Sequence, residues 1–287
     1  MGLFNRSNVK SIYMRKKNFT SWGMACLLGC CLMFSGCSSE EEATLGAEGK
    51  GAVQFSLTAN MGFDAKTKAA VNEDTYMTTH PLENYKVQIL NSEGTVVQNC
   101  DWVYKDVPKE LIELKNGSYK IVAFDGREFN TNASTRDGIY MYGETELTIN
   151  SNQVAKKSVA CAPACGKLVV KFGENMDKYF TDYSVQFKTK AAGEGGSLNW
   201  AKSDVDPLYV KIDKAGESVT ASFTITTKAG KKAEVNALTR SMKWGSMWTI
   251  NVNPKVEDTT GKVGITITFD DKTNDKPIDI EIPSDWL

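Results

Sequence analysis

Apolar and polar residues alternate with a period of two along much of the chain after residue 50. In the stretch "VTASFTITT" (219–227), every second residue from Val219 to Ile225 is apolar and the others are threonine or serine. The stretches "VGITITFD" (263–270) and "AVQFSLTA" (52–59) have the same pattern. Successive side chains of a strand point to opposite faces, so each stretch predicts a strand with one buried and one solvated face. Such alternation is typical of antiparallel sheets.

Helical spacing is scarce in the same region. The stretch "ENMDKYFTDY" carries apolar residues at i, i+3, i+4 and i+7 from Met176 to Tyr183, which predicts one short helix or turn. Asn116 and Gly117 lie between two strand-like runs in "ELIELKNGSYKIVAF" and predict a β-hairpin, because that turn needs positive φ. About fourteen strand candidates follow residue 50, few of them separated by helix-length segments. The pattern therefore predicts an all-β protein.

Short segments of the first half recur in the second half in the same order. "KGAVQF" (50–55) is similar to "CGKLVVKF" (165–172), and "YKVQI" (85–89) is similar to "YSVQF" (183–187). Two further pairs are "GSYKIVA" (117–123) with "GSMWTINV" (245–252) and "GETELTI" (143–149) with "GKVGITIT" (261–268). The repeat predicts two tandem antiparallel β-sandwiches, residues 51–162 and 163–287. One long sandwich is the alternative, less favoured because about seven strands already form a sandwich.

The N-terminus has the layout of a secretory signal. Residues 1–36 contain five basic residues and no acidic residue, and an apolar run begins near Trp22. This run of about fifteen residues is shorter than the roughly 20 residues that a transmembrane helix needs. An uncleaved membrane anchor is the alternative. Residues 1–36 are therefore predicted to be a cleaved signal peptide.

The end of this run resembles the bacterial lipoprotein box, in which a cysteine after small residues is acylated and becomes the mature N-terminus. Here Ser35 and Gly36 precede Cys37, although Phe34 stands where the pattern prefers leucine. We expect lipidation at Cys37 and an acidic tether over residues 37–50. The tether begins with a stretch that resembles a surface-export signal of gut-anaerobe lipoproteins; an ordinary solvated linker is the alternative. Its residues are Ser38, Ser39, Glu40, Glu41 and Glu42.

Charge and cysteine usage narrow the remaining functions. The signal holds five of the 34 basic and none of the 35 acidic residues, so the mature chain has 29 against 35, a net charge of −6. An acidic chain without a basic stripe argues against a nucleic-acid partner. Three cysteines remain after lipidation, and the spacing in "CAPAC" fits neither a thioredoxin motif nor a zinc site. We expect Cys100, Cys161 and Cys165 to be small buried residues, with a local Cys161–Cys165 disulfide as the alternative.

The sequence offers little catalytic chemistry. His80 is the single histidine, so a histidine-based metal site or proton relay has no second imidazole. The stretch "DDKTND" (270–275) lacks the glycine and the final glutamate of a calcium loop. We expect no catalytic residue, no metal and no cofactor. Trp244 and Trp248 in "KWGSMW" are four residues apart and would point the same way on a strand. They form either a glycan-stacking platform or part of a sandwich core.

Together these stretches resemble the surface lipoproteins of the family called domain of unknown function 4493, which is similar in layout to the fimbrillins. The resemblance rests on the lipoprotein box, "KGAVQFSLTAN", "NGSYKIVAF", "YMYGETELTI", "SVACAPACGKLVVKFGENMDKYFTDYSVQF" and "ITITFDD…IDIEIPSDW". It implies Greek-key, transthyretin-like or fimbrillin-like sandwiches and a non-enzymatic protein. It also implies a lipid-anchored outer-membrane protein facing the cell exterior, whose partners are pilus subunits or the surface of a host or neighbouring cell.

One departure concerns polymerisation. Fimbrillin subunits are cut after an arginine near the first strand, which opens a groove for a donor strand of the next subunit. Here no arginine lies between Cys37 and Arg127, and only Lys66 and Lys68 lie where a cut is expected. An anchored accessory protein, a tip protein of a fimbria or a stand-alone binding protein is therefore favoured over a shaft subunit, and adhesion or a fimbria-accessory role is the expected function. The alternative function is a glycan-binding surface lipoprotein of a polysaccharide-uptake system.

Overall fold

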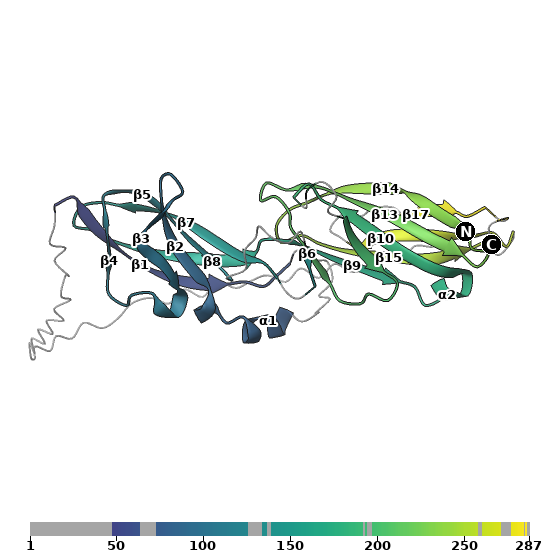
Figure 1. Ribbon diagram of the computed structural model, residues 1–287, viewed down its shortest axis with the longest axis horizontal. Coiled ribbons are helices and arrows are strands. Elements are labelled where there is room, and N and C mark those ends of the chain that lie inside the picture. The colour runs from purple at the N-terminus through teal and green to yellow at the C-terminus, as the bar shows by residue number, and fades with distance from the viewer. Residues whose placement is uncertain are drawn as a thin grey trace, which may run out of the picture. The chain divides into compact units, whose positions relative to one another are not determined.

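The computed structural model describes residues 48–63, 73–125, 134–136, 139–191, 193, 197–257, 260–270, 277–283 and 285. Strands dominate these residues, and the fold is all-β with two tandem antiparallel β-sandwiches (Figure 1). The predicted fold class is thus confirmed.

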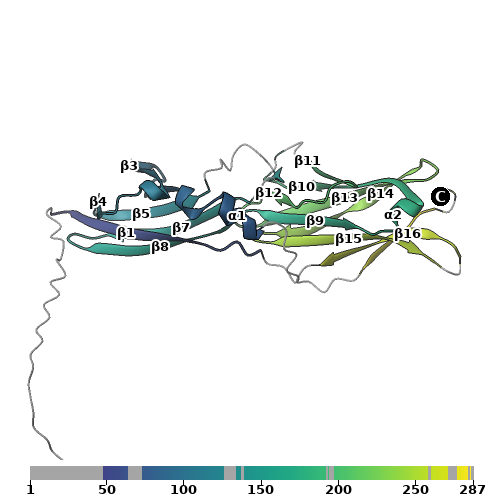
Figure 2. The ribbon, with the colours of Figure 1, turned by 90° about the horizontal axis from the view of Figure 1, so that it is seen from below.

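The first sandwich contains seven of the described strands in the order β3-β2-β5-β7-β8-β1-β4. Its two layers, β3-β2-β5-β7 and β8-β1-β4, join where β7 pairs with β8 at Met141–Pro163 and Tyr142–Ala162. Figure 2 shows β1 and β8 in a layer below β5. The strands are β1 (Lys50–Ala59), β2 (Lys86–Asn91), β3 (Val96–Val103), β4 (Ile112–Lys115), β5 (Gly117–Phe124), β7 (Met141–Ile149) and β8 (Val154–Pro163); the helical segments are α1 (Glu73–Thr79), η1 (Leu82–Asn84) and η2 (Tyr104–Asp106).

The second sandwich contains a layer in the order β11-β10-β13-β14 and a layer in the order β17-β16-β15-β9-β12-β6. In Figure 2, β10, β13 and β14 lie above β9, β15 and β16. The elements are β9 (Gly166–Phe172), α2 (Met176–Tyr179), β10 (Phe180–Lys188), β11 (Ser197–Ala201), β12 (Leu208–Val210), β13 (Glu217–Thr227), β14 (Lys232–Met242), β15 (Met247–Val256), β16 (Val263–Asp270), β17 (Ile278–Glu281) and β6 (Ser134–Thr135). Among these, β6 comes from the first half of the chain and pairs with β12.

The two sandwiches repeat one topology. The order β3-β2-β5-β7 matches β11-β10-β13-β14, and β8-β1-β4 matches β15-β9-β12. In both, the first strand lies parallel to a late one, β1 to β8 and β9 to β15. The similar segments in β1 and β9, and in β2 and β10, therefore occupy equivalent strands. The other two pairs do not, because β5 and β7 correspond to β13 and β14 rather than to β15 and β16. Short alternating segments coincide easily, and those two pairs are such coincidences.

The hairpin predicted at Asn116–Gly117 is wrong. Strand β4 pairs with β1, whereas β5 pairs with β2 and β7, so the chain crosses from one layer to the other at this point. Leu114 of β4 is 5% exposed and belongs to the core of the first sandwich. Burial of this side chain beside β1 outweighs the local turn preference, since a two-residue turn would place β4 against β5 instead.

Alternation explains the two cores. The predicted inward residues from Val219 to Ile225 of β13 are buried, and the threonines between them are only partly buried. One cluster of buried side chains fills each sandwich, although Cys165 and Tyr209 belong to the first cluster. The predicted helix is confirmed only as the short α2, after which β10 begins at Phe180.

The division at 162/163 falls at the end of β8, whose last residue is Pro163, and it stays a prediction as a domain boundary. By their contacts, the described residues from 48 to 285 belong to one compact unit. A backbone hydrogen bond crosses this division, because the amide of Ala164 donates to the carbonyl of Tyr140 at 2.7 Å. A side chain at Gly166 would press against the Sδ of Met242 of β14, so Met242 would have to shift to admit it.

Candidate functional site

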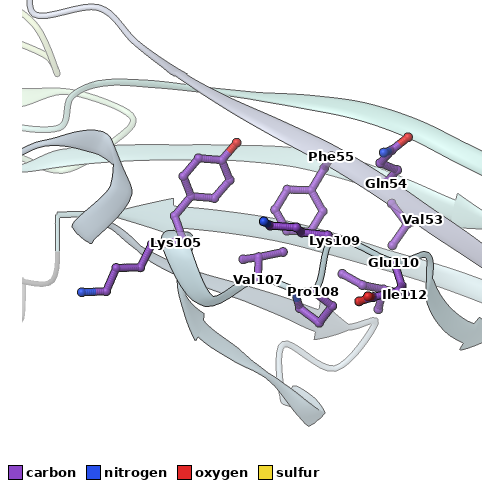
Figure 3. A pocket seen from close by; sticks show the side chains of 10 residues that line it. Val53, Gln54, Phe55, Lys105, Val107, Pro108, Lys109, Glu110 and Ile112 are labelled. Carbon is purple, nitrogen blue, oxygen red and sulfur yellow. The ribbon is translucent and has the colours of Figure 1, made fainter.

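A groove of about 350 Å³ lies beside the first strand, between β1 and the segment 104–112 (Figure 3). We call it the β1 groove. Its lining consists of Val53, Gln54, Phe55, Tyr104, Lys105, Val107, Pro108, Lys109, Glu110 and Ile112. All these residues belong to the first sandwich.

The groove follows an edge of β1 that has no strand partner. Strand β1 pairs with β8 from Ala52 to Ala59, but with β4 only from Lys50 to Val53. Beyond Val53, the β4 side of β1 is therefore an open edge within the described residues. An open edge presents backbone N–H and C=O groups to whatever lies beside it.

Tyr104 holds the opposite wall in place. Its backbone N–H donates to the carbonyl of Tyr85 at 2.8 Å, and its hydroxyl accepts from the N–H of Leu57 at 3.2 Å. The single turn of η2 follows, closed by the N–H of Val107 donating to the carbonyl of Tyr104 at 3.2 Å. Pro108 then lacks an N–H, which prevents the segment from continuing as a ladder along β1.

The lining combines an apolar floor with charged rims. Phe55, Val107 and Ile112 are half-buried, whereas Lys105, Lys109 and Glu110 are exposed. In Figure 3 the ring of Phe55 points from β1 toward the segment that carries Val107 and Lys109. Apolar area at the centre and charges around it are the arrangement found where proteins bind other proteins. The groove can bind a partner by burying its apolar floor while the lysines attract carboxylates.

The predicted tryptophan platform is not formed. Trp248 of β15 is 4% exposed and packs in the second core, with its ring 5.9 Å edge-on from Phe269. Trp244 lies before β15 rather than on it, and Gly245 between them has a φ of 75°. The two rings therefore do not share a strand face. Trp248 is therefore a core residue, as the alternative interpretation expected.

Trp244 instead belongs to a cluster where the two sandwiches meet, which the sequence did not indicate. Its indole N–H donates to the carbonyl of Ile212 at 2.7 Å, and its ring lies 5.7 Å from that of Tyr142. The Tyr142 hydroxyl donates to Glu144 at 2.7 Å, and Lys214 also donates to Glu144. The hydrogen bond from Lys214 holds the pKa of Glu144 below its usual range, with smaller contributions from Tyr142 and Lys120. We call these residues the junction cluster.

The three cysteines are buried, as predicted, and form no disulfide with one another. Burial raises the pKa of Cys161 to about 11, with a further contribution from the charge of Asp125, and burial also raises the pKa of Cys100. His80 stacks on Tyr76 with ring centroids 4.3 Å apart. Within the described part of the chain, no group of three or more His, Cys, Asp or Glu side chains is arranged to hold a metal ion.

Several predicted positions lie outside the described residues. They are the signal peptide 1–36, Cys37, Ser38, Ser39, Glu40, Glu41, Glu42, Lys66, Lys68 and most of "DDKTND". Lipidation and export remain predictions. Among the residues that are described, none of the helices has the length and apolar character needed to cross a membrane.

No curated protein matches the chain. Similar solved structures include a candidate adhesin from Bacteroides ovatus, with a TM-score of 0.41 and 10% identity, covering 77% of this chain and 95% of that chain. A candidate polysaccharide-binding protein from Bacteroides thetaiotaomicron has a TM-score of 0.39 and 10% identity, covering 82% and 99%. A candidate cell adhesion protein from Bacteroides eggerthii has a TM-score of 0.38 and 12% identity, covering 79% and 96%.

The family comparison covers most of the chain. The profile of "Domain of unknown function (DUF4493)" matches residues 49–284, which run from the residue before β1 to beyond β17. The chain therefore belongs to the DUF4493 family.

Proposed function

We propose that the protein is a lipid-anchored outer-membrane protein, exposed at the cell surface, that works by contact as an adhesion or fimbria-accessory protein. The observation that carries the proposal is the sequence around Cys37: small residues end an apolar run, and Glu40–Glu42 follow. Each buried CH₂ of an acyl chain contributes roughly 0.8 kcal/mol, so two or more chains hold such a protein stably in a bilayer. The acidic tether keeps the following β1 in water.

The β1 groove gives this role a contact surface. Its apolar floor and its exposed Lys105 and Lys109 suit an acidic segment of another protein. The described residues of the groove lining include no histidine, cysteine, serine or aspartate. We therefore propose binding rather than turnover at this site.

Anchoring is tested first. Mass spectrometry of the mature N-terminus should show acyl chains on Cys37, and protease added to intact cells should degrade the protein. A Cys37→Ser variant should lose the lipid and leave the membrane fraction, whereas Cys100→Ser, at a buried cysteine, should stay anchored. An unmodified Cys37 thiol in the native protein would contradict the proposal.

Contact is tested next with a strain that lacks the gene, in assays of binding to host cells and to neighbouring bacteria. Adhesion should fall on deletion and return with the native gene. The double variant Lys105→Glu/Lys109→Glu should restore it poorly, whereas Lys156→Glu, an exposed lysine of β8 outside the groove, should restore it fully. Unchanged adhesion on deletion would reject the adhesion role.

A further inference from the structure

A second depression lies on the outward face of the β11-β10-β13-β14 layer, with a volume of about 560 Å³. We call it the β10–β14 hollow. Strand register places its polar side chains in two adjacent rows. One row runs Asn199–Gln186–Ser222 and the other runs Ser184–Thr224–Glu234. The volume is within the range of about 300–1,000 Å³ that is common for small-ligand sites.

The hollow results from small residues and from a β-bulge. The pairing of β10 with β13 is equivalent to that of β2 with β5 in the first sandwich. In that pairing, Ser184 corresponds to Lys86, Ser222 to Val122 and Thr224 to Phe124, so each of these positions in the hollow has a smaller residue. The register of β13 with β14 shifts between Ala221 and Phe223, beside the floor of the hollow. A bulge bends and twists a strand locally, and such bends are frequent next to binding sites.

The part of the chain that the structure describes leaves the hydrogen-bonding capacity of this surface unused. None of the six polar side chains in the two rows forms a hydrogen bond or ion pair with another described residue. On the same sheet, by contrast, Thr220 and Thr239 bond to each other at 3.1 Å. Two amides, three hydroxyls and one carboxylate are therefore directed at solvent within one depression.

These groups define the chemistry of a ligand. Amides and hydroxyls both donate and accept hydrogen bonds, and sugar hydroxyls do the same. Neighbouring hydroxyls of a sugar can therefore form hydrogen bonds with neighbouring side chains of this surface. Glu234 is the only charged residue among the described residues of the lining, and a negative charge disfavours an anionic ligand. We propose that the β10–β14 hollow is a binding site for a neutral carbohydrate, with Gln186 and Asn199 as its principal hydrogen-bonding residues.

This inference deepens the proposed contact function, on which it rests for its biological setting, by naming the chemical class of one partner. Binding itself depends on neither the anchor nor adhesion. A test on the purified protein therefore fails or succeeds independently of the cell assays, which concern Cys37 and the β1 groove.

The test is native electrophoresis of the full chain in mild detergent through gels containing mannan, dextran or galactan, with polygalacturonate as the anionic comparison. At least one neutral polymer should retard the protein. Gln186→Ala/Asn199→Ala should weaken that retardation at least about tenfold in apparent affinity, because buried hydrogen bonds to the ligand are lost. Ser184→Lys, which introduces at this position the lysine of the first sandwich, should abolish it by filling the hollow.

The matched control is Gln88→Ala/Asp101→Ala, a directly opposed pair on β2 and β3 that occupies the equivalent positions of the first sandwich. It should leave retardation unchanged. Retardation by no neutral polymer, or by polygalacturonate alone, would overturn the proposal. Retardation that survives both Gln186→Ala/Asn199→Ala and Ser184→Lys would place any carbohydrate site elsewhere. If the double variant does not fold, as circular dichroism would show, Ser184→Lys decides the outcome.

Discussion

The outward face of β3-β2-β5-β7 carries ion pairs, whereas the equivalent face of β11-β10-β13-β14 carries five neutral polar side chains and one carboxylate around a hollow. In the first sandwich, Lys86 lies 3.0 Å from Asp101, and Lys120 lies 3.6 Å from Glu144 and 3.4 Å from Glu146. In the second sandwich, the position of Lys86 is taken by Ser184. The charges of the first face are neutralised within the protein, and the polar groups of the second face are open to a ligand.

The inner faces differ much less, although the residues are not identical. Ile89 of β2 and Phe187 of β10 occupy equivalent inward positions, and both are 0% exposed. The comparison shows that inward alternation maintains the shared topology, while the outward positions of the same strands are free to differ. Binding chemistry can therefore change on one sandwich without loss of fold.

The largest loss of stability should come from a substitution on the inward side of β10, where the two sandwiches are most alike. Phe187→Ala removes a fully buried ring and should lower the free energy of unfolding by about 3–5 kcal/mol, as measured by urea denaturation. Gln186→Ala, its exposed neighbour on β10, should change it by less than about 0.5 kcal/mol. A loss below about 1 kcal/mol for Phe187→Ala would mean that the second core collapses around the cavity.

The next largest loss of stability should come from a substitution in the junction cluster. Trp244→Phe removes the indole N–H that bonds the carbonyl of Ile212, a residue that is 2% exposed. The buried acceptor then lacks that partner, so the variant should lose about 1–2 kcal/mol of stability. Trp102→Phe is the matched control, because no hydrogen bond joins its indole to a described residue. Equal losses for the two variants would show that ring volume, not the hydrogen bond, matters at Trp244.

Much of this inner framework could be predicted from the sequence, because it is local. Alternation from Val219 to Ile225 identified a strand with its buried face, and the segments 50–55 and 85–89 were matched to their true equivalents in the second sandwich. The hairpin prediction at Asn116–Gly117 is wrong because a turn preference is local, whereas burial of Leu114 decides which strand β4 pairs with. Long-range pairing overrides a two-residue signal.

The candidate sites could not be predicted, because they depend on register between distant strands. The β1 groove joins residues 53–55 to residues 104–112, and no pattern in the sequence indicates this pairing of distant segments. The hollow joins residues of four strands, and a bulge on β14 is invisible in an alternating pattern. Trp244 and Trp248 had the right spacing for a platform, but the turn at Gly245 separates them.

A smaller effect is expected for the charge of Glu144 at the junction cluster. Glu144→Gln should cost about 0.5–1 kcal/mol at pH 7. Because the folded protein lowers the pKa of Glu144, this contribution is complete above the ordinary glutamate value of about 4.3 and is lost as the pH falls through the lowered pKa. Urea midpoints of the two proteins should therefore converge below about pH 4. Glu146→Gln, at a side chain that is 78% exposed and shares Lys120, should differ less from wild type at every pH.

The smallest effect tests whether the ion pairs of the first face matter for stability at all. Lys86→Ser removes the pair with Asp101, in which the side chains are 42% and 43% exposed. Exposed pairs gain little because water screens them, so the loss should be below about 0.5 kcal/mol and should vanish at 1 M salt. A salt-independent loss above 1 kcal/mol would mean that the first face is held together by its charges. A negligible loss would mean that these pairs contribute little to stability, so that the exchange of Lys86 for Ser184 between the two faces is free to serve binding, which Ser184→Lys tests in the opposite direction.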